Sequence, residues 1–203
     1  MASTMIHLLL AHKINPNGCG LYFLGSFAPD AFDDKREDKK DAKNINHFRN
    51  TADMEIAITE FYTQIDKTNP FHMGYFVHLI CDMWWQEVID DFRKWHNETP
   101  NLEPNWYKAM MHEYRLAGVY IRQNMPWVDG VFTKMLTQTD SFQSPLPDPS
   151  NEEIYARLNK TATAWKADKQ KPLGKPSAFF TDAFLEAYAN EISLEYARWT
   201  NSK

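Results

Sequence analysis

The stretch PFHMGYFVHLICDMWWQEVIDDF, residues 70–92, decides the fold because it is apolar on nearly every side. A helix that is apolar all round is buried inside a protein, and proline is favoured in the first turn of a helix. The pattern therefore predicts a buried central helix that begins at Pro70. Gly74, His78 and Asp82 recur every four residues along it, so they share one helix face.

The rest of the chain also favours helices. Its 203 residues include only seven glycines, and the alternating pattern typical of strands is scarce. Further helices are predicted over residues 3–13, 46–67, 106–124, 128–136, 152–166 and 178–199, most of them followed by a turn, a proline or a loop. The charged run 33–43 and the proline-rich segment 141–150 are expected to be exposed loops. We therefore predict an all-α fold, a single multi-helix bundle.

Composition limits the possible classes of protein. The length fits one domain, residues 1–203, and hydrophobic and charged fractions of 43% and 24% are ordinary for a globular chain. The net charge of −5 provides no basic field, which argues against duplex nucleic acid as a partner but allows a small phosphoester. Two cysteines make a disulfide framework implausible, and no apolar run approaches the roughly 18 residues of a transmembrane segment. We expect a cytoplasmic protein.

His78 and Asp82 are the first candidates for chemistry, because side chains four residues apart on a helix can bind one ion. Taken alone, the pair is more simply read as a hydrogen bond within the core. Burying a carboxylate without a partner is costly, however, and Asp82 is flanked by apolar and aromatic residues. A cation would offset that cost. Gly74, which lowers helix propensity by about 1 kcal/mol relative to alanine, suggests close approach of a backbone or an ion.

Three upstream residues are candidate partners for this pair. His7 lies in an apolar helical segment, Asp30 ends an Ala-Pro-Asp turn, and His47 stands at the start of the segment 46–67. Each has a plainer interpretation, as a core histidine, a turn residue and a solvent-exposed helix start, respectively. Imidazole and carboxylate together are the ligands that zinc prefers, so the five residues as a set favour a metal site.

The order of these residues resembles the zinc-dependent phospholipase C family, particularly its short intracellular bacterial members. The resemblance covers about the first 90 residues, and the segments that carry it are His7, 25–30 (GSFAPD), 47–48 (HF) and 74–82 (GYFVHLICD). It implies an all-helical domain with the phospholipase C/P1 nuclease fold and a zinc cluster that cleaves phosphodiesters. The family motif G-x-x-x-H-x-x-x-D supplies two ligands from one helix.

By this resemblance, Asp30 and His47 complete a first metal site with His78 and Asp82, and His7 belongs to a second ion that Asp82 bridges. The chain departs from the family in two respects. Secreted members use their processed N-terminal residue as a ligand, whereas His7 is preceded by six residues. The downstream half also lacks the H-x-x-x-E spacing. His112 is a remaining candidate ligand, although the adjacent Glu113 lies about 100° away around the helix. We expect one or two zinc ions.

The resulting hypothesis is a metal-dependent phosphoesterase. Metal-activated water would attack the phosphorus of a phosphodiester or phosphomonoester, and metal charge would stabilise the oxyanions that develop. Asp30, as the catalytic residue, would also orient the water. One alternative is a non-catalytic helical metal-binding or interaction protein with a degraded site, which the missing downstream histidines favour. A second is an HD-like phosphohydrolase, against which the absence of an adjacent His-Asp pair counts.

Overall fold

A computed structural model describes residues 2–172 and 175–203, and across these residues the chain is helical with no strand. The elements are α1 (Thr4–Ile14), α2 (Gly20–Phe27), the 3-10 turn η1 (Ala28–Asp30), α3 (Lys39–Asn46), α4 (Met54–Gln64), α5 (Pro70–Glu98), α6 (Trp106–Asn124), α7 (Trp127–Leu136), α8 (Asn151–Asp168) and α9 (Asp182–Asn201). The predicted all-α class is confirmed for the described residues.

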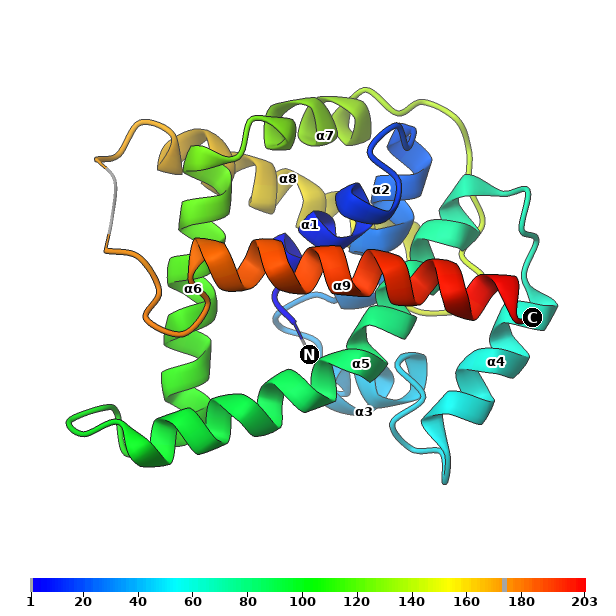
Figure 1. Cartoon of the computed structure of the whole chain (residues 1–203). Helices are drawn as coiled ribbons and strands as arrows, with labels where there is room; N and C mark the ends of the chain where they lie inside the picture. The colour runs from blue at the N-terminus through cyan, green and yellow to red at the C-terminus, as the bar shows by residue number, and fades with distance from the viewer. Residues whose placement is uncertain (1, 173–174) are drawn as a thin grey trace.

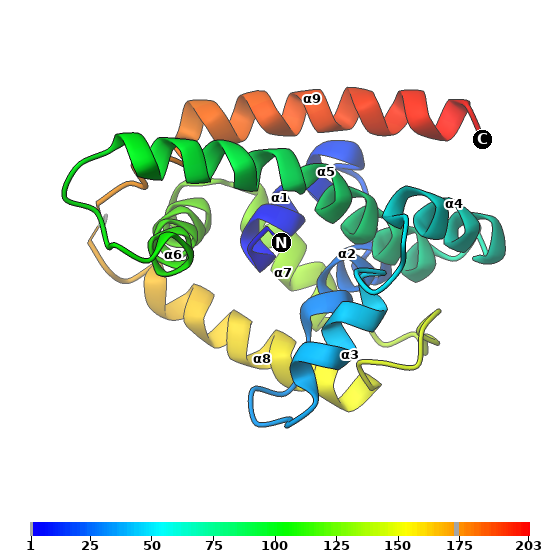
Figure 2. The same cartoon turned by 90° about the horizontal axis from the view of Figure 1, so that it is seen from below.

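Helix α1 lies in the middle of the molecule, with α2, α5, α6 and α9 packed against it (Figures 1 and 2). Every residue from Met5 to Ala11 is buried. This part of the helix is therefore enclosed on all sides, and its one polar side chain, His7, must find its partners inside the protein. The buried apolar side chains form one connected cluster around it.

Helix α5 is the predicted central helix. The side chain of Asn69 caps its N-terminus by accepting hydrogen bonds from the backbone N–H groups of Phe71 and His72, and Pro70 occupies the first turn. Its first half is almost wholly buried, from Gly74 to Asp82. The helix continues to Glu98, past the predicted end near Phe92, and buries only one side there. None of the helices across the described ranges is long and apolar enough to cross a bilayer.

Two glycines let α2 and α5 touch through their backbones. A Cβ atom on Gly74 would lie 1.9 Å from the carbonyl oxygen of Tyr22, and one on Gly25 would lie 2.1 Å from that of Phe71. Cβ atoms do not approach backbone this closely, so neither position accepts a larger residue without moving a helix. The close approach suggested by Gly74 is thus made by the backbone of α2.

The segment between α2 and α5 differs from the sequence prediction. Helix α3 falls largely within the charged run 33–43, where we expected a loop, and α4 begins only at Met54 instead of near residue 46. The charged side chains of the run find partners elsewhere: Arg36 pairs with Asp148 at 2.7 Å. Phe48 adopts a positive φ of 55°, which ends α3, and Asp53 caps α4 by accepting from Ile56 N. His47 is therefore the C-cap of α3 and not a helix start.

We expect Gly74→Ala to lower the free energy of unfolding by about 3 kcal/mol or more, because the new methyl group must push α2 away from α5. The matched control is Gly130→Ala in α7, where nothing lies within 4 Å of the added Cβ. That change should leave stability unchanged or raise it by about 0.5–1 kcal/mol through helix propensity. Urea unfolding of both variants measures the difference, and equal stabilities would contradict the backbone contact.

Candidate metal centre

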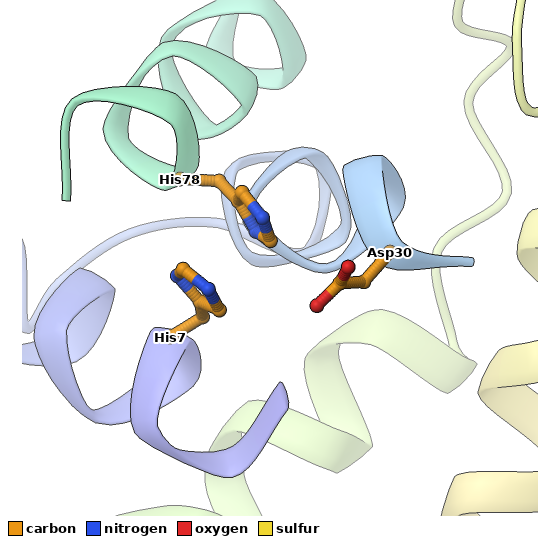
Figure 3. Close-up of side chains that lie close together, drawn as sticks. All are labelled: His7, Asp30 and His78. Carbon is orange, nitrogen blue, oxygen red and sulfur yellow. The ribbon is translucent and has the colours of Figure 1, made fainter. Parts of the chain in front are cut away.

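Five of the predicted ligands meet in the interior. His7 comes from α1, Asp30 from the end of η1, His47 from the C-cap of α3, and His78 and Asp82 from α5. They form two overlapping groups, His7 with Asp30 and His78, and His47 with His78 and Asp82. Within each group the donor atoms all lie within 4.8 Å of one another. Figure 3 shows the first group, with the three side chains converging from three different elements.

The Nε2 atoms of His47 and His78 lie 3.2 Å apart. His47 Nε2 also lies 3.7 Å from an oxygen of Asp30 and 3.7 Å from an oxygen of Asp82. The ring of His7 stacks on that of His78 with centroids 3.6 Å apart. Its Nε2 atom reaches to 3.2 Å from Asp82 Oδ1. Nitrogen and oxygen donors thus surround one small space.

The outer nitrogens of His47 and His78 fix the tautomers of the two rings. His78 Nδ1 lies 2.8 Å from the carbonyl oxygen of Ser26, and His47 Nδ1 lies 2.7 Å from that of Lys43. A carbonyl oxygen accepts hydrogen bonds and cannot donate them, so each Nδ1 carries a proton and each neutral ring presents a bare Nε2. Two lone pairs therefore face each other at 3.2 Å. This arrangement is repulsive unless a cation lies between them.

A proton does not meet that need near neutral pH. Burial, reinforced by the nearby His7, lowers the pKa of His78 well below its ordinary value. Burial also lowers the pKa of His47, although Asp82 and Asp30 oppose the shift. Both rings are therefore neutral at pH 7. Neutral imidazole is the form that binds divalent metals.

The two carboxylates are ionised in the same space. Burial by itself raises the pKa of Asp30, but Lys43, whose Nζ lies 2.6 Å away, and the surrounding histidines hold it well below its ordinary value. Burial likewise raises the pKa of Asp82, but His7, His47 and the other positive charges nearby together hold it well below the ordinary range. Arg49 Nη2 lies 2.7 Å from Asp82 Oδ2. Each carboxylate thus already has one cationic neighbour.

Three ligand atoms are enclosed without an aligned hydrogen bond among the described residues: both ring nitrogens of His7 and Asp30 Oδ1. The approaches of His7 to Asp82 and of Lys43 to Asp30 are close, but neither has the direction of a hydrogen bond. Buried polar atoms left in this way are costly. Three imidazoles and two carboxylates are a donor set suited to zinc, so a divalent ion fits the residues present.

The structure does not bring His112 to this cluster. Its side chain lies on the exposed side of α6, where its ring contacts Arg115. The neighbouring Glu113 takes the inward position instead and accepts hydrogen bonds from Ser177 Oγ and from the backbone of Ala178 and Phe179. The expectation for His112 is therefore corrected: the 100° step between adjacent helical residues turns it outward.

Sequence reasoning missed the two cations of the centre. Lys43 was assigned to an exposed loop, yet it contacts Asp30 and its carbonyl oxygen orients His47. Arg49 follows His47 by two residues and reaches Asp82. The nearness of both residues to His47 in the sequence was the available signal. Helix α3, which was not predicted, carries Lys43, and Arg49 follows the turn that ends this helix.

Comparisons of the chain with protein-family models, with curated proteins and with solved structures found no match. The candidate centre is therefore defined by its geometry alone. That geometry brings together five of the six ligand candidates, from four separate elements of the chain.

We expect the metal-stripped protein to lose stability as pH falls from about 6.5 to 5. The pKa values of His47 and His78 are lower in the folded state than in the unfolded state. The unfolded chain therefore binds more protons in this window, and stability rises with pH by up to about 1.4 kcal/mol per pH unit for each histidine. Asp30 and Asp82, with lowered pKa values, act only at more acidic pH.

Urea unfolding of the stripped protein at several pH values measures this slope. His47→Gln should reduce it by about the contribution of one histidine. A stability that stays flat between these pH values would show that the rings are not held neutral by burial.

Proposed function

We propose that this chain is a metal-dependent phosphoesterase with a helical fold of the phospholipase C/P1 nuclease type. The observation that carries the proposal is the pair of facing Nε2 lone pairs on His47 and His78, set beside the ionised carboxylates of Asp30 and Asp82. Four acceptors that converge in this way require a cation. Zinc is the proposed ion because imidazole and carboxylate are its preferred partners.

The residues divide between two ions in this proposal. Asp30, His47, His78 and Asp82 would hold the first ion, and His7 with the second oxygen of Asp82 would contribute to another. A bound divalent ion supplies Lewis-acid chemistry: it lowers the pKa of water and polarises a phosphoryl oxygen. The carbonyl oxygens of Ser26 and Lys43 hold the imidazoles in the tautomer this chemistry needs.

Asp30 is the residue we assign to the attacking water. Its side chain is 11% exposed, whereas those of His7, His47 and Asp82 are exposed by no more than 4% and His78 is buried, so Asp30 marks the side of the cluster nearest to solvent. Its carboxylate is ionised and can orient a water molecule by accepting a hydrogen bond from it. A small phosphoester, approached from this side, is the proposed substrate, and the two free cysteines fit a cytoplasmic setting.

One observation favours a second candidate, a non-catalytic protein with a degraded site. Lys43 and Arg49 already lie 2.6 and 2.7 Å from the two carboxylates. In this alternative the cluster is a buried ion-pair network. The two cations neutralise the carboxylates, as the metal ion would in the phosphoesterase. The two candidates differ in whether the purified protein retains an ion.

We expect purified wild-type protein to contain one or two zinc equivalents and His78→Ala to contain about a tenth or less, because His78 belongs to both ligand groups. His112→Ala is the matched control: the same substitution at an exposed ring should leave the zinc content unchanged. Elemental analysis and circular dichroism measure metal and helicity together. A folded wild type without metal, even after incubation with zinc, would favour the ion-pair network.

We expect Asp30→Asn to lower kcat on bis(p-nitrophenyl) phosphate or p-nitrophenyl phosphate by about 10²–10⁴-fold at saturating zinc, since the neutral amide binds the ion less well and does not orient the water as a carboxylate does. Asp90→Asn, at an exposed position of α5, makes the same chemical change far from the centre and should retain activity. If a zinc-loaded wild type hydrolyses neither ester, the phosphoesterase proposal fails.

A further inference from the structure

A cavity of about 650 Å³ lies between the first turn of α1 and the helices α6 and α8. Ser3, Thr4 and Met5 form its wall on α1. Figure 2 shows this end of α1 facing the viewer, with α6 and α8 on two sides of it. The opposite walls carry four cationic side chains: Arg115, Arg122, Arg157 and Lys160. Its volume is in the range that small-molecule sites occupy.

The positive charge of this cavity is only partly neutralised. Asp34 is its one acidic lining residue, and it is shared by Arg157 at 3.2 Å, by Lys160 and by Lys39 at 2.7 Å. Three cations thus meet one carboxylate. Arg115 has no carboxylate partner within the described ranges, and its side chain lies 3.1 Å from Nδ1 of His112. A local excess of positive charge in a chain of net charge −5 points to an anionic ligand.

Arg122 is different from its neighbours. It is bound to Asp168 through Nε at 2.9 Å and Nη2 at 2.6 Å. Asp168 also accepts from Lys171. We therefore assign the free charge of the cavity to Arg115 and to the group around Asp34.

The first turn of α1 presents further donors to the same space. Ser3 is the N-cap residue, but its side chain accepts no hydrogen bond from the helix, and its Oγ atom is enclosed without a partner in the described chain. The first N–H groups of a helix have no partner within the helix, and together they carry a partial positive charge. An anion in the cavity would satisfy them.

This cavity adjoins the metal centre through the same residues. The backbone N–H of Ala2 donates to Asp82 Oδ1 at 3.2 Å, and the carbonyl oxygen of Ser3 accepts from the N–H of His7 at 2.9 Å. Ser3, which lines the cavity, is therefore hydrogen-bonded to His7, and its neighbour Ala2 is hydrogen-bonded to Asp82.

We propose that the cavity binds a second phosphate group of the substrate, so that the preferred substrates are small esters carrying two phosphate groups. The proposal rests on the phosphoesterase function for its meaning, although binding itself does not need the metal. The guanidinium groups of Arg115 and Arg157 each offer a planar pair of donors that matches phosphate oxygens. Hydrolysis takes place at the metal centre, and the cavity holds the part of the substrate that does not react.

The test is calorimetric titration of the metal-stripped protein with inorganic phosphate. We expect Arg115→Gln combined with Arg157→Gln to raise the Kd by tenfold or more, while zinc content and Tm stay near those of the wild type. Arg198→Gln is the control, because it removes the same charge from an exposed site on α9. Equal binding by wild type and double variant, or an equal loss in the control, would overturn the proposal.

Other outcomes separate this proposal from the phosphoesterase function. Phosphate binding that depends on Arg115 and Arg157 in a protein that hydrolyses no ester supports the cavity site and rejects the function. Ester hydrolysis by a protein whose phosphate binding is unaltered in the double variant supports the phosphoesterase function and rejects the cavity site. Vesicles of equal parts phosphatidylcholine and phosphatidic acid should not sediment the protein, and arginine-dependent sedimentation would assign the cavity to lipid and overturn the small ester.

Discussion

The contact between α2 and α5 at Gly25 and Gly74 is the constraint on which the metal centre depends. Because neither glycine has a Cβ, the two helix backbones touch, and one turn beyond Gly74 the ring of His78 meets the carbonyl oxygen of Ser26. That hydrogen bond fixes the tautomer of His78 and turns its Nε2 inward. The same packing places η1, which follows α2 directly, so that Asp30 faces the imidazoles. Helix packing thus determines which atoms can bind an ion.

The centre is an electrostatic compromise inside a nonpolar interior. Two buried carboxylates need positive charge, and Lys43 and Arg49 supply some of it. Neither cation lies between the Nε2 atoms of His47 and His78, so the repulsion of those lone pairs remains. Buried ion pairs are stable only when their remaining acceptors are satisfied. A divalent ion would bind the two facing Nε2 atoms, which Lys43 and Arg49 do not neutralise. For this reason we favour a metal site over an ion-pair network alone.

The sequence predicted those parts of the fold and site that depend on local pattern. The apolar run 70–92 gave α5, and the four-residue spacing put His78 and Asp82 on one face. Helix α3 could not be predicted, because its neighbouring charges are paired with distant residues, as Arg36 is with Asp148. The choice between His112 and Glu113 was likewise open, since it depends on where Ser177 lies. Local spacing defines a helix face, whereas long-range contacts decide which face is buried.

Helix α1 connects the metal centre and the cationic cavity. Its uncapped first turn faces the cavity, and one turn later His7 stacks on His78. Positive charge from Arg115, from the cations around Asp34 and from the end of the helix therefore lies around the first turn of the helix that carries His7. These positive charges would repel a metal ion in the centre. An anion bound between the cavity and the ion would reduce that repulsion. The proposed substrate with two anionic groups would match both regions at once.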